Sequence, residues 1–257
     1  MKYLVMLAVA TALVASACTS STTPADSKSY VSSKVGAYVI NDNLSYSVKG
    51  GPSVEPSDST VVMSTTTITD DAGVTKTAII LVAFVDGMPY DTTVIAEEGS
   101  KVYMLFELNL AAGDVVPPVS VGSRWALVAD ANATSSWTSI QETITDIDFD
   151  YNGTTFPADV AFKLSGSKIA DTTMSISGSN VAAIKYTLDY SIDMTVKIGP
   201  PIGNIVIPIA LKSNVYFGEN IGVVRQDQDA TTITIPLIGQ SFDIDGFKSV
   251  AVRTGGN

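Results

Sequence analysis

Two facts about chemically active residues limit what this sequence can do: it contains no histidine, and Cys18 is its only cysteine. Without histidine the chain lacks the usual general acid–base group and the usual partner of a nucleophilic serine or cysteine. It also lacks the commonest protein ligand for zinc, copper and non-haem iron. We therefore expect no enzymatic activity and no cofactor.

The remaining candidates for site chemistry are carboxylates. Asp148, Asp150 and Asn152 alternate before a glycine, and Asp159 stands at the twelfth place, which matches the spelling of a calcium-binding loop. Calcium prefers oxygen ligands arranged in this way, but a proline interrupts the loop and no helical pattern flanks it. The stretch is more typical of a β-hairpin with an Asn-Gly turn, and these four residues are a weak calcium candidate.

A second motif joins Ser165 and Lys168, which spell the S-x-x-K signature of penicillin-recognising enzymes. That chemistry needs the serine and lysine one helical turn apart, together with S-D-N and K-T-G partners, and the sequence contains neither partner. Because glycine and serine separate the two residues, we predict a turn here, between strands at 158–164 and 172–177.

The N-terminal stretch carries a targeting signal. Lys2 is followed by an uncharged run from Leu4 to Val14, which is shorter than the about 20 residues that span a bilayer but suits a signal peptide. The small residues Ala15-Ser16-Ala17 before Cys18 then resemble a bacterial lipobox, although the usual pattern has Leu, Val or Ile at the first of them. At a lipobox, a diacylglyceryl group is transferred to the cysteine and the chain is cut before it. The alternative is an ordinary secretory signal, which would leave a free thiol.

The lipobox resemblance implies three segments: a signal peptide at 1–17, an acylated cysteine with a flexible tether at 18–33, and a single β-rich domain at 34–257. Thr19 is not the aspartate that marks retention in the inner membrane of enterobacteria. The resemblance therefore implies a bacterial envelope protein that acyl chains such as palmitate hold on the outer membrane, facing the periplasm.

The charge of the chain limits its partners. A formal net charge of −11 repels nucleic-acid phosphates and anionic lipid headgroups. We expect no nucleic-acid partner, and we expect attachment to the membrane through the acyl chains of Cys18 alone. Since one cysteine cannot form an internal disulfide, the core must be stabilised by packing.

The clearest structural pattern lies at 184–198, where apolar and polar residues alternate without a break. This period predicts a half-buried antiparallel strand, about 50 Å long at about 3.3 Å per residue. A second alternating run at 205–217 follows the Gly- and Pro-rich stretch 199–204, so the two runs form a long hairpin. Pro208 must then lie at a sheet edge or a bulge.

Strand patterns fill the rest of the chain, and no stretch of ten residues has a convincing helical period. Further strands are expected at 61–69, 75–85, 102–110, 137–151, 231–237 and 248–253, and one short helix is allowed at 129–136. The run 79–85 is apolar on both faces, which is typical of a central strand covered on both sides. The pattern predicts an all-β fold: a large antiparallel sheet of long strands, curled into an open or closed barrel, with little helix.

Two short elements carry a second resemblance. Val121-Gly122-Ser123-Arg124-Trp125 and the stretch 216–224 look like the "vGxxW" and "yfxxgiGlV" elements of a broad set of uncharacterised β-rich lipoproteins. Those proteins are distantly similar to the lipoprotein-carrier (Lol-type) fold, an antiparallel sheet around a hydrophobic cavity. The resemblance implies tight turns and a packed Trp125.

Two functional hypotheses follow. The first is a membrane-anchored periplasmic lipoprotein without catalytic activity, which holds an apolar ligand or lipid in its curved sheet and needs empty apolar volume there. The alternative is a structural or protein-interaction subunit of an envelope complex, or an adhesin-like β domain, with a filled interior. A hydrolase with two facing carboxylates ranks last.

Overall fold

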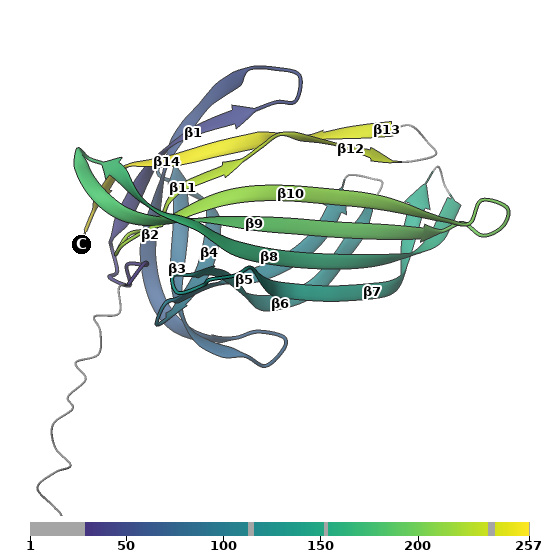
Figure 1. The fold of residues 1–257 in the computed structure, drawn as a ribbon, viewed down its shortest axis with the longest axis horizontal. Helices are drawn as coiled ribbons and strands as arrows, with labels where there is room; N and C mark the ends of the chain where they lie inside the picture. The colour runs from purple at the N-terminus through teal and green to yellow at the C-terminus, as the bar shows by residue number, and fades with distance from the viewer. Residues whose placement is uncertain (1–28, 113–115, 152–153, 236–239, 257) are drawn as a thin grey trace, which may run out of the picture.

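A computed structural model describes residues 29–112, 116–151, 154–235 and 240–256 (Figure 1). These residues form strands and turns only, and no helix among them could cross a membrane. The short helix that the sequence allowed at 129–136 is not formed, because these residues end one strand and turn toward the next. The strands are β1 (Tyr38–Tyr46), β2 (Pro52–Thr69), β3 (Thr75–Val85), β4 (Met88–Glu98), β5 (Lys101–Ala112), β6 (Val116–Asp130), β7 (Trp137–Tyr151), β8 (Thr154–Ile176), β9 (Ser179–Lys197), β10 (Asn204–Gly218), β11 (Gly222–Gln228), β12 (Thr231–Ile235), β13 (Gln240–Ile244) and β14 (Gly246–Gly255).

Twelve of the strands form one antiparallel sheet in the order β6-β5-β4-β3-β2-β1-β14-β11-β10-β9-β8-β7. The sheet curls until its two edge strands, β6 and β7, approach each other, so it is nearly closed into a barrel (Figure 1). Strands β12 and β13 form a separate hairpin. The all-β prediction, with long antiparallel strands curled toward a barrel, is confirmed.

Side chains close the seam between β6 and β7. The Nε1 of Trp137 and the Oγ of Ser139 both donate to the carbonyl oxygen of Leu127, each at 2.9 Å. The Nζ of Lys168 reaches the carbonyl of Ala131, also at 2.9 Å. In the described part of the chain no backbone ladder joins these two strands, so the barrel is completed by side-chain hydrogen bonds.

The predicted turn at Ser165–Lys168 is wrong, because β8 runs through these residues without interruption. Gly166 lies opposite Trp137 in the ladder, and a Cβ on Gly166 would collide with the indole ring. The glycine is therefore the strand position over which the ring packs, not a chain reversal. What the sequence suggested as two short strands is one strand of 23 residues.

The long hairpin is confirmed as β9 and β10, which pair from Asn204 opposite Lys197 to Gly218 opposite Ala183. Pro208 pairs with β9 alone, because β10 meets β11 only from Ser213 onward, so the proline lies in an edge segment as expected. The apolar face of β9 is buried in the barrel, with Ile184, Tyr186, Leu188, Ile192, Met194 and Val196 in the core.

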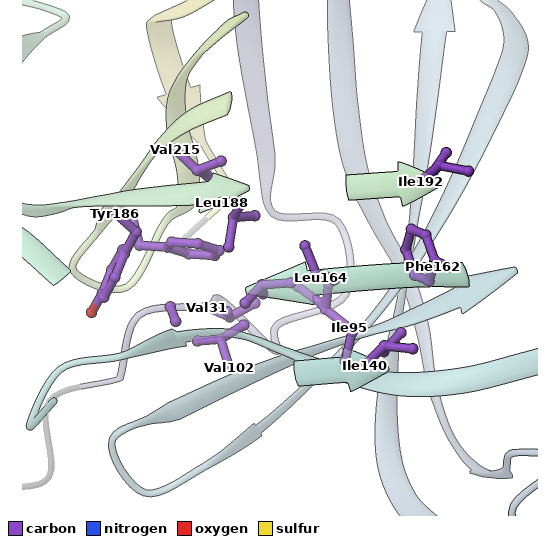
Figure 2. Packing of buried hydrophobic residues seen from close by; sticks show 14 of the residues in the cluster. Val31, Ile95, Val102, Ile140, Phe162, Leu164, Tyr186, Leu188, Ile192 and Val215 are labelled. Atoms are coloured by element: carbon purple, nitrogen blue, oxygen red, sulfur yellow. The ribbon is translucent and has the colours of Figure 1, made fainter. Parts of the chain in front are cut away.

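These β9 side chains pack in a filled core. Figure 2 shows Phe162 and Leu164 of β8 in one cluster with Ile95 of β4 and Val102 of β5. Phe106 of β5 stacks on Phe162 with ring centroids 6.2 Å apart. The space beneath the longest strands, where the ligand hypothesis places empty volume, is thus occupied by side chains.

The packed chain begins earlier than the expected boundary at residue 34. Tyr30 and Val31 are 8% and 3% exposed and belong to the main core. The Oγ of Ser29 donates to the carboxylate of Glu97 at 2.6 Å, and its carbonyl accepts from the backbone N–H of Asn220 at 2.8 Å. Residues 29–31, assigned to a flexible tether, are therefore packed against the barrel wall.

The turn between β2 and β3 docks on β6, and this explains the "vGxxW" element. The buried carboxylate of Asp70 accepts from the backbone N–H groups of Val74 and Trp125 at 2.8 and 2.9 Å. Asp71 accepts from the N–H of Ser123 at 2.6 Å, and a Cβ on Gly122 would lie 2.5 Å from its carboxylate oxygen. Gly122 also has φ +74°, which favours glycine. The "vGxxW" element is therefore the segment of β6 to which the β2–β3 turn binds, next to the buried Trp125.

The turn between β8 and β9, at the left of Figure 1, folds back over the outer face of the sheet. Ile176, the last residue of β8, packs with Val39, Val224 and Ala251 of three neighbouring strands. The backbone N–H of Ser177 donates to the carbonyl of Val252 at 3.2 Å. This hairpin end covers β1, β11 and β14 from outside.

The second resembling element, 216–224, is the turn from β10 to β11 together with the strand ends on either side of it. Phe217 is buried in the core, and a Cβ on Gly218 would come 2.6 Å from the side chain of Val224. Asn220 and Gly222 have positive φ. The implied tight turn is therefore present, and Gly222 faces the cavity described next.

Candidate functional site

Several of the predicted site residues lie outside the part of the chain that the structure describes. Cys18, Asn152 and the side chain of Asp150 lie outside the described residues, and Asp148 is exposed. Asp159 is engaged by the Nζ of Lys197 at 2.7 Å, and this hydrogen bond is the main reason that the pKa of Asp159 lies below its ordinary value. In the ranges that the structure covers, no three acidic side chains gather as metal ligands do. Both lipidation and calcium binding stay predictions.

A cavity of about 430 Å³ lies inside the other half of the barrel. Strands β1 to β4 form one wall, and β10, β11 and β14 form the opposite wall. The volume falls in the range of about 300–1,000 Å³ that is typical of small-molecule sites. This cavity is the strongest candidate site in the described chain, and it adjoins the filled core, because Val62, Ile95 and Phe217 belong to both.

The lining of the cavity changes from charged to apolar along two strands. β2 contributes Asp58, Thr60 and Val62, and β4 contributes Asp91, Thr93 and Ile95. Each strand places every second side chain on the inner face, and β2 and β4 run in the same direction because both pair antiparallel with β3. Both strands therefore lead from a carboxylate through a hydroxyl to an apolar side chain.

The apolar end is completed by side chains from other strands. Leu81, Met104, Phe217 and Val223 line the cavity beside Val62 and Ile95. Hydrogen-bonding groups are gathered at the other end, so an occupant would meet two chemically different environments.

Asp58 organises the polar end. Its side chain is 8% exposed, and its carboxylate accepts from the Nδ2 atoms of Asn41 and Asn43 at 2.7 and 2.8 Å. The register of β1 against β2 shifts between these two asparagines, which brings both of them to the same carboxylate. The third donor is the hydroxyl of Tyr90 at 3.1 Å.

Tyr90 lies at the margin of this network. The residue is 58% exposed, yet its hydroxyl points to Asp58. Desolvation of the hydroxyl, followed by the negative charge of Asp58, raises the pKa of Tyr90 to about 12. Tyr90 therefore stays protonated at neutral pH and acts as a hydrogen-bond donor.

The opposite wall carries two positively charged side chains, of which one forms an ion pair among the described residues and the other does not. Arg225 contacts Asp227 through Nε at 2.9 Å and through Nη2 at 2.7 Å, so its charge is compensated. Lys248 also lines the cavity, and no acidic side chain of the described chain forms an ion pair with it.

Sequence reasoning missed this site, although a signal for it exists. The stretches 58–62 and 91–95 share the spelling Asp-x-Thr-x-(Val or Ile) in two strands. The pattern becomes meaningful only when β2 and β4 are placed on either side of β3 and face inward.

Comparisons with known proteins add little to this geometry. No family model matches the chain, and no curated protein is significantly similar to it in sequence. Among solved structures, it is similar to a crystal structure described as a "putative lipoprotein" from Parabacteroides distasonis, with 9% identity and a TM-score of 0.44 over 89% of this chain and 99% of the other. A likeness of this degree assigns the chain to no family.

Proposed function

We propose that the protein is a bacterial envelope lipoprotein without catalytic activity, which holds an apolar or amphiphilic ligand in the cavity between β1–β4 and β10, β11 and β14. Acyl chains on Cys18 anchor it to the outer membrane, facing the periplasm. The observation that carries the proposal is the graded lining, since binding sites for small molecules are mostly apolar with a few placed polar groups.

The state of the carboxylates favours binding over hydrolysis. A catalytic pair would need one carboxyl group free to attack or to accept a proton. Asp58 is already held by three neutral donors, and Glu55 accepts from the Oγ of Ser45 at 2.7 Å. These contacts fix the side chains as parts of the wall.

Native mass spectrometry of the full chain, extracted from membranes in a mild detergent, tests the ligand. We expect an additional mass beyond the anchor acyl chains, belonging to an apolar or amphiphilic molecule that organic solvent removes. A chain that carries only its own acyl groups would contradict the ligand proposal.

The anchor has a separate test. Changing Cys18→Ser removes the only thiol that can be acylated, so the protein should move from the membrane fraction to the soluble fraction. Ser16→Ala keeps a small residue in the lipobox and should leave attachment unchanged. Membrane attachment that persists in Cys18→Ser would show that another part of the chain holds it there.

An interaction role is the second candidate, because two strands of the cavity wall also carry exposed apolar side chains. Val54 of β2 is 83% exposed and Met88 of β4 is 70% exposed. A stable protein partner in pull-downs from solubilised membranes, lost in Val54→Ser with Met88→Ser, would favour this role over ligand storage.

A further inference from the structure

Asp58 is a buried negative charge without a positive partner. Its three hydrogen-bond donors are two amides and a phenol, and none of the ion pairs between described residues includes it. Burying a carboxylate is costly unless a cation and further hydrogen bonds compensate for the loss of water. A carboxylate offers about four acceptor positions, so three donors leave one position for a group in the cavity.

The whole polar end of the cavity has an excess of negative charge. Glu55, Asp58 and Asp91 line it, against Arg225 and Lys248. Arg225 is already compensated by Asp227, which does not face this cavity. Three carboxylates thus face one uncompensated lysine, and the complementary ligand group is a cation.

We infer that the cavity selects a single-chain amphiphile that ends in an ammonium group, and that Asp58 binds this group. The inference rests on the proposed function and specifies its ligand. The apolar chain lies against Val62, Ile95 and Met104, where the lining is hydrophobic, and the ammonium group replaces the missing cation of Asp58. A volume of about 430 Å³ is near the lower end of the range for small-molecule sites, which favours one chain over two.

The inference is tested on the full acylated chain in membrane vesicles with three photoreactive probes. Each probe has a dodecyl chain with a diazirine, and the chains end in an amine, an alcohol or a carboxylate. Labelled peptides are mapped by mass spectrometry to β2, β4 and β11. We expect the amine to label these strands on the order of tenfold more strongly than the alcohol, and the carboxylate least, as for a hydrogen bond between charged groups.

Two variants locate the preference. In Asp58→Asn, amine labelling should fall to the level of the alcohol, while alcohol labelling persists and shows that the cavity is intact. Asp193→Asn removes an equal charge from an exposed position on β9 and should leave all labelling unchanged. If Asp58→Asn fails to fold, the ranking of the probes on the unaltered chain still decides.

The outcomes separate the two proposals. Equal labelling of the cavity strands by all three probes, or a preference for the carboxylate, overturns the ammonium inference and leaves the proposed function standing. Labelling by none of the probes overturns both. Unlabelled dodecylamine and lysophosphatidylethanolamine, added as competitors, distinguish a simple alkylamine from a lipid headgroup, and competition by neither overturns the inference.

Discussion

At the scale of single residues, Asp70 is a carboxylate whose role is structural. Burial by itself would raise its pKa, but the backbone N–H groups of Trp125, Val74 and Ala72, with Arg124 nearby, lower the pKa below the ordinary 3.8. The folded state therefore favours the ionised carboxylate of Asp70 over the protonated acid. Protonating Asp70 weakens the contact between the β2–β3 turn and β6.

Changing Asp70→Asn should lower the free energy of unfolding by about 1–3 kcal/mol at pH 7, since an ionised acceptor is replaced by a neutral one. Because the folded pKa is depressed, this stabilisation is present above the unfolded value and is lost as the pH falls below 3.8. Urea unfolding, followed by tryptophan fluorescence at pH 7 and pH 3.5, should show the difference between the two proteins shrinking in acid. A difference that does not depend on pH would contradict the role of the charge.

Gly122 offers a second test at this scale. Gly122→Ala adds a methyl group 2.5 Å from the Asp71 carboxylate in a backbone conformation with φ +74°. Gly73→Ala is the matched control, with φ +81° and nothing within 4 Å of the added atom. The control should lower the free energy of unfolding by about 1–2 kcal/mol, because alanine is strained in the left-handed backbone conformation. Gly122→Ala should lower the free energy of unfolding by about 1 kcal/mol more, because it also displaces the hydrogen bond between Asp71 and the N–H of Ser123. Equal decreases for the two variants in urea unfolding would show that this contact does not stabilise the fold.

At the scale of elements, the end of the β8–β9 hairpin covers the outside of the sheet. Ile176→Ala should lower the free energy of unfolding by about 2–5 kcal/mol, because it leaves a cavity against Val39 and Val224. Ile169→Ala, on the same strand but 52% exposed, should change it by no more than about 0.5 kcal/mol. Thermal unfolding of the two variants measures the contrast, and similar midpoints would mean that the hairpin end is not held against the sheet.

Alternation of apolar and polar residues predicted most strands, because each has one dry face. The predictions were wrong where one sequence feature is compatible with two structures. Gly166 between serines is typical of a turn, and only the position of Trp137 across the ladder shows that the glycine makes room for a ring. Likewise, the polar composition of 29–33 does not reveal that Tyr30 and Val31 are buried among strands far along the chain.

At the scale of the whole molecule, the cavity depends on contacts that sequence spacing does not contain. β1 pairs with β14, which brings the two ends of the described chain together and places Lys248 opposite Leu44. Asn41 lies opposite Asp58 in the β1–β2 ladder, and Tyr90 reaches Asp58 from β4, on the other side of β3. The sequence therefore predicted an apolar interior with empty volume beneath the longest strands. In the structure the empty volume lies instead between β1–β4, β11 and β14.

The most direct test of the central claim is to fill the cavity and measure what the protein still carries. Ala83 lines the cavity on β3, so Ala83→Phe should occupy its volume, whereas Ala210→Phe adds the same ring to an exposed position on β10. Mass spectrometry of organic extracts from the purified full chains gives the amount of bound apolar molecule per protein. We predict that the unaltered chain and Ala210→Phe carry similar amounts and that Ala83→Phe loses most of its ligand. An Ala83→Phe chain that folds and carries as much as the unaltered chain would contradict the account.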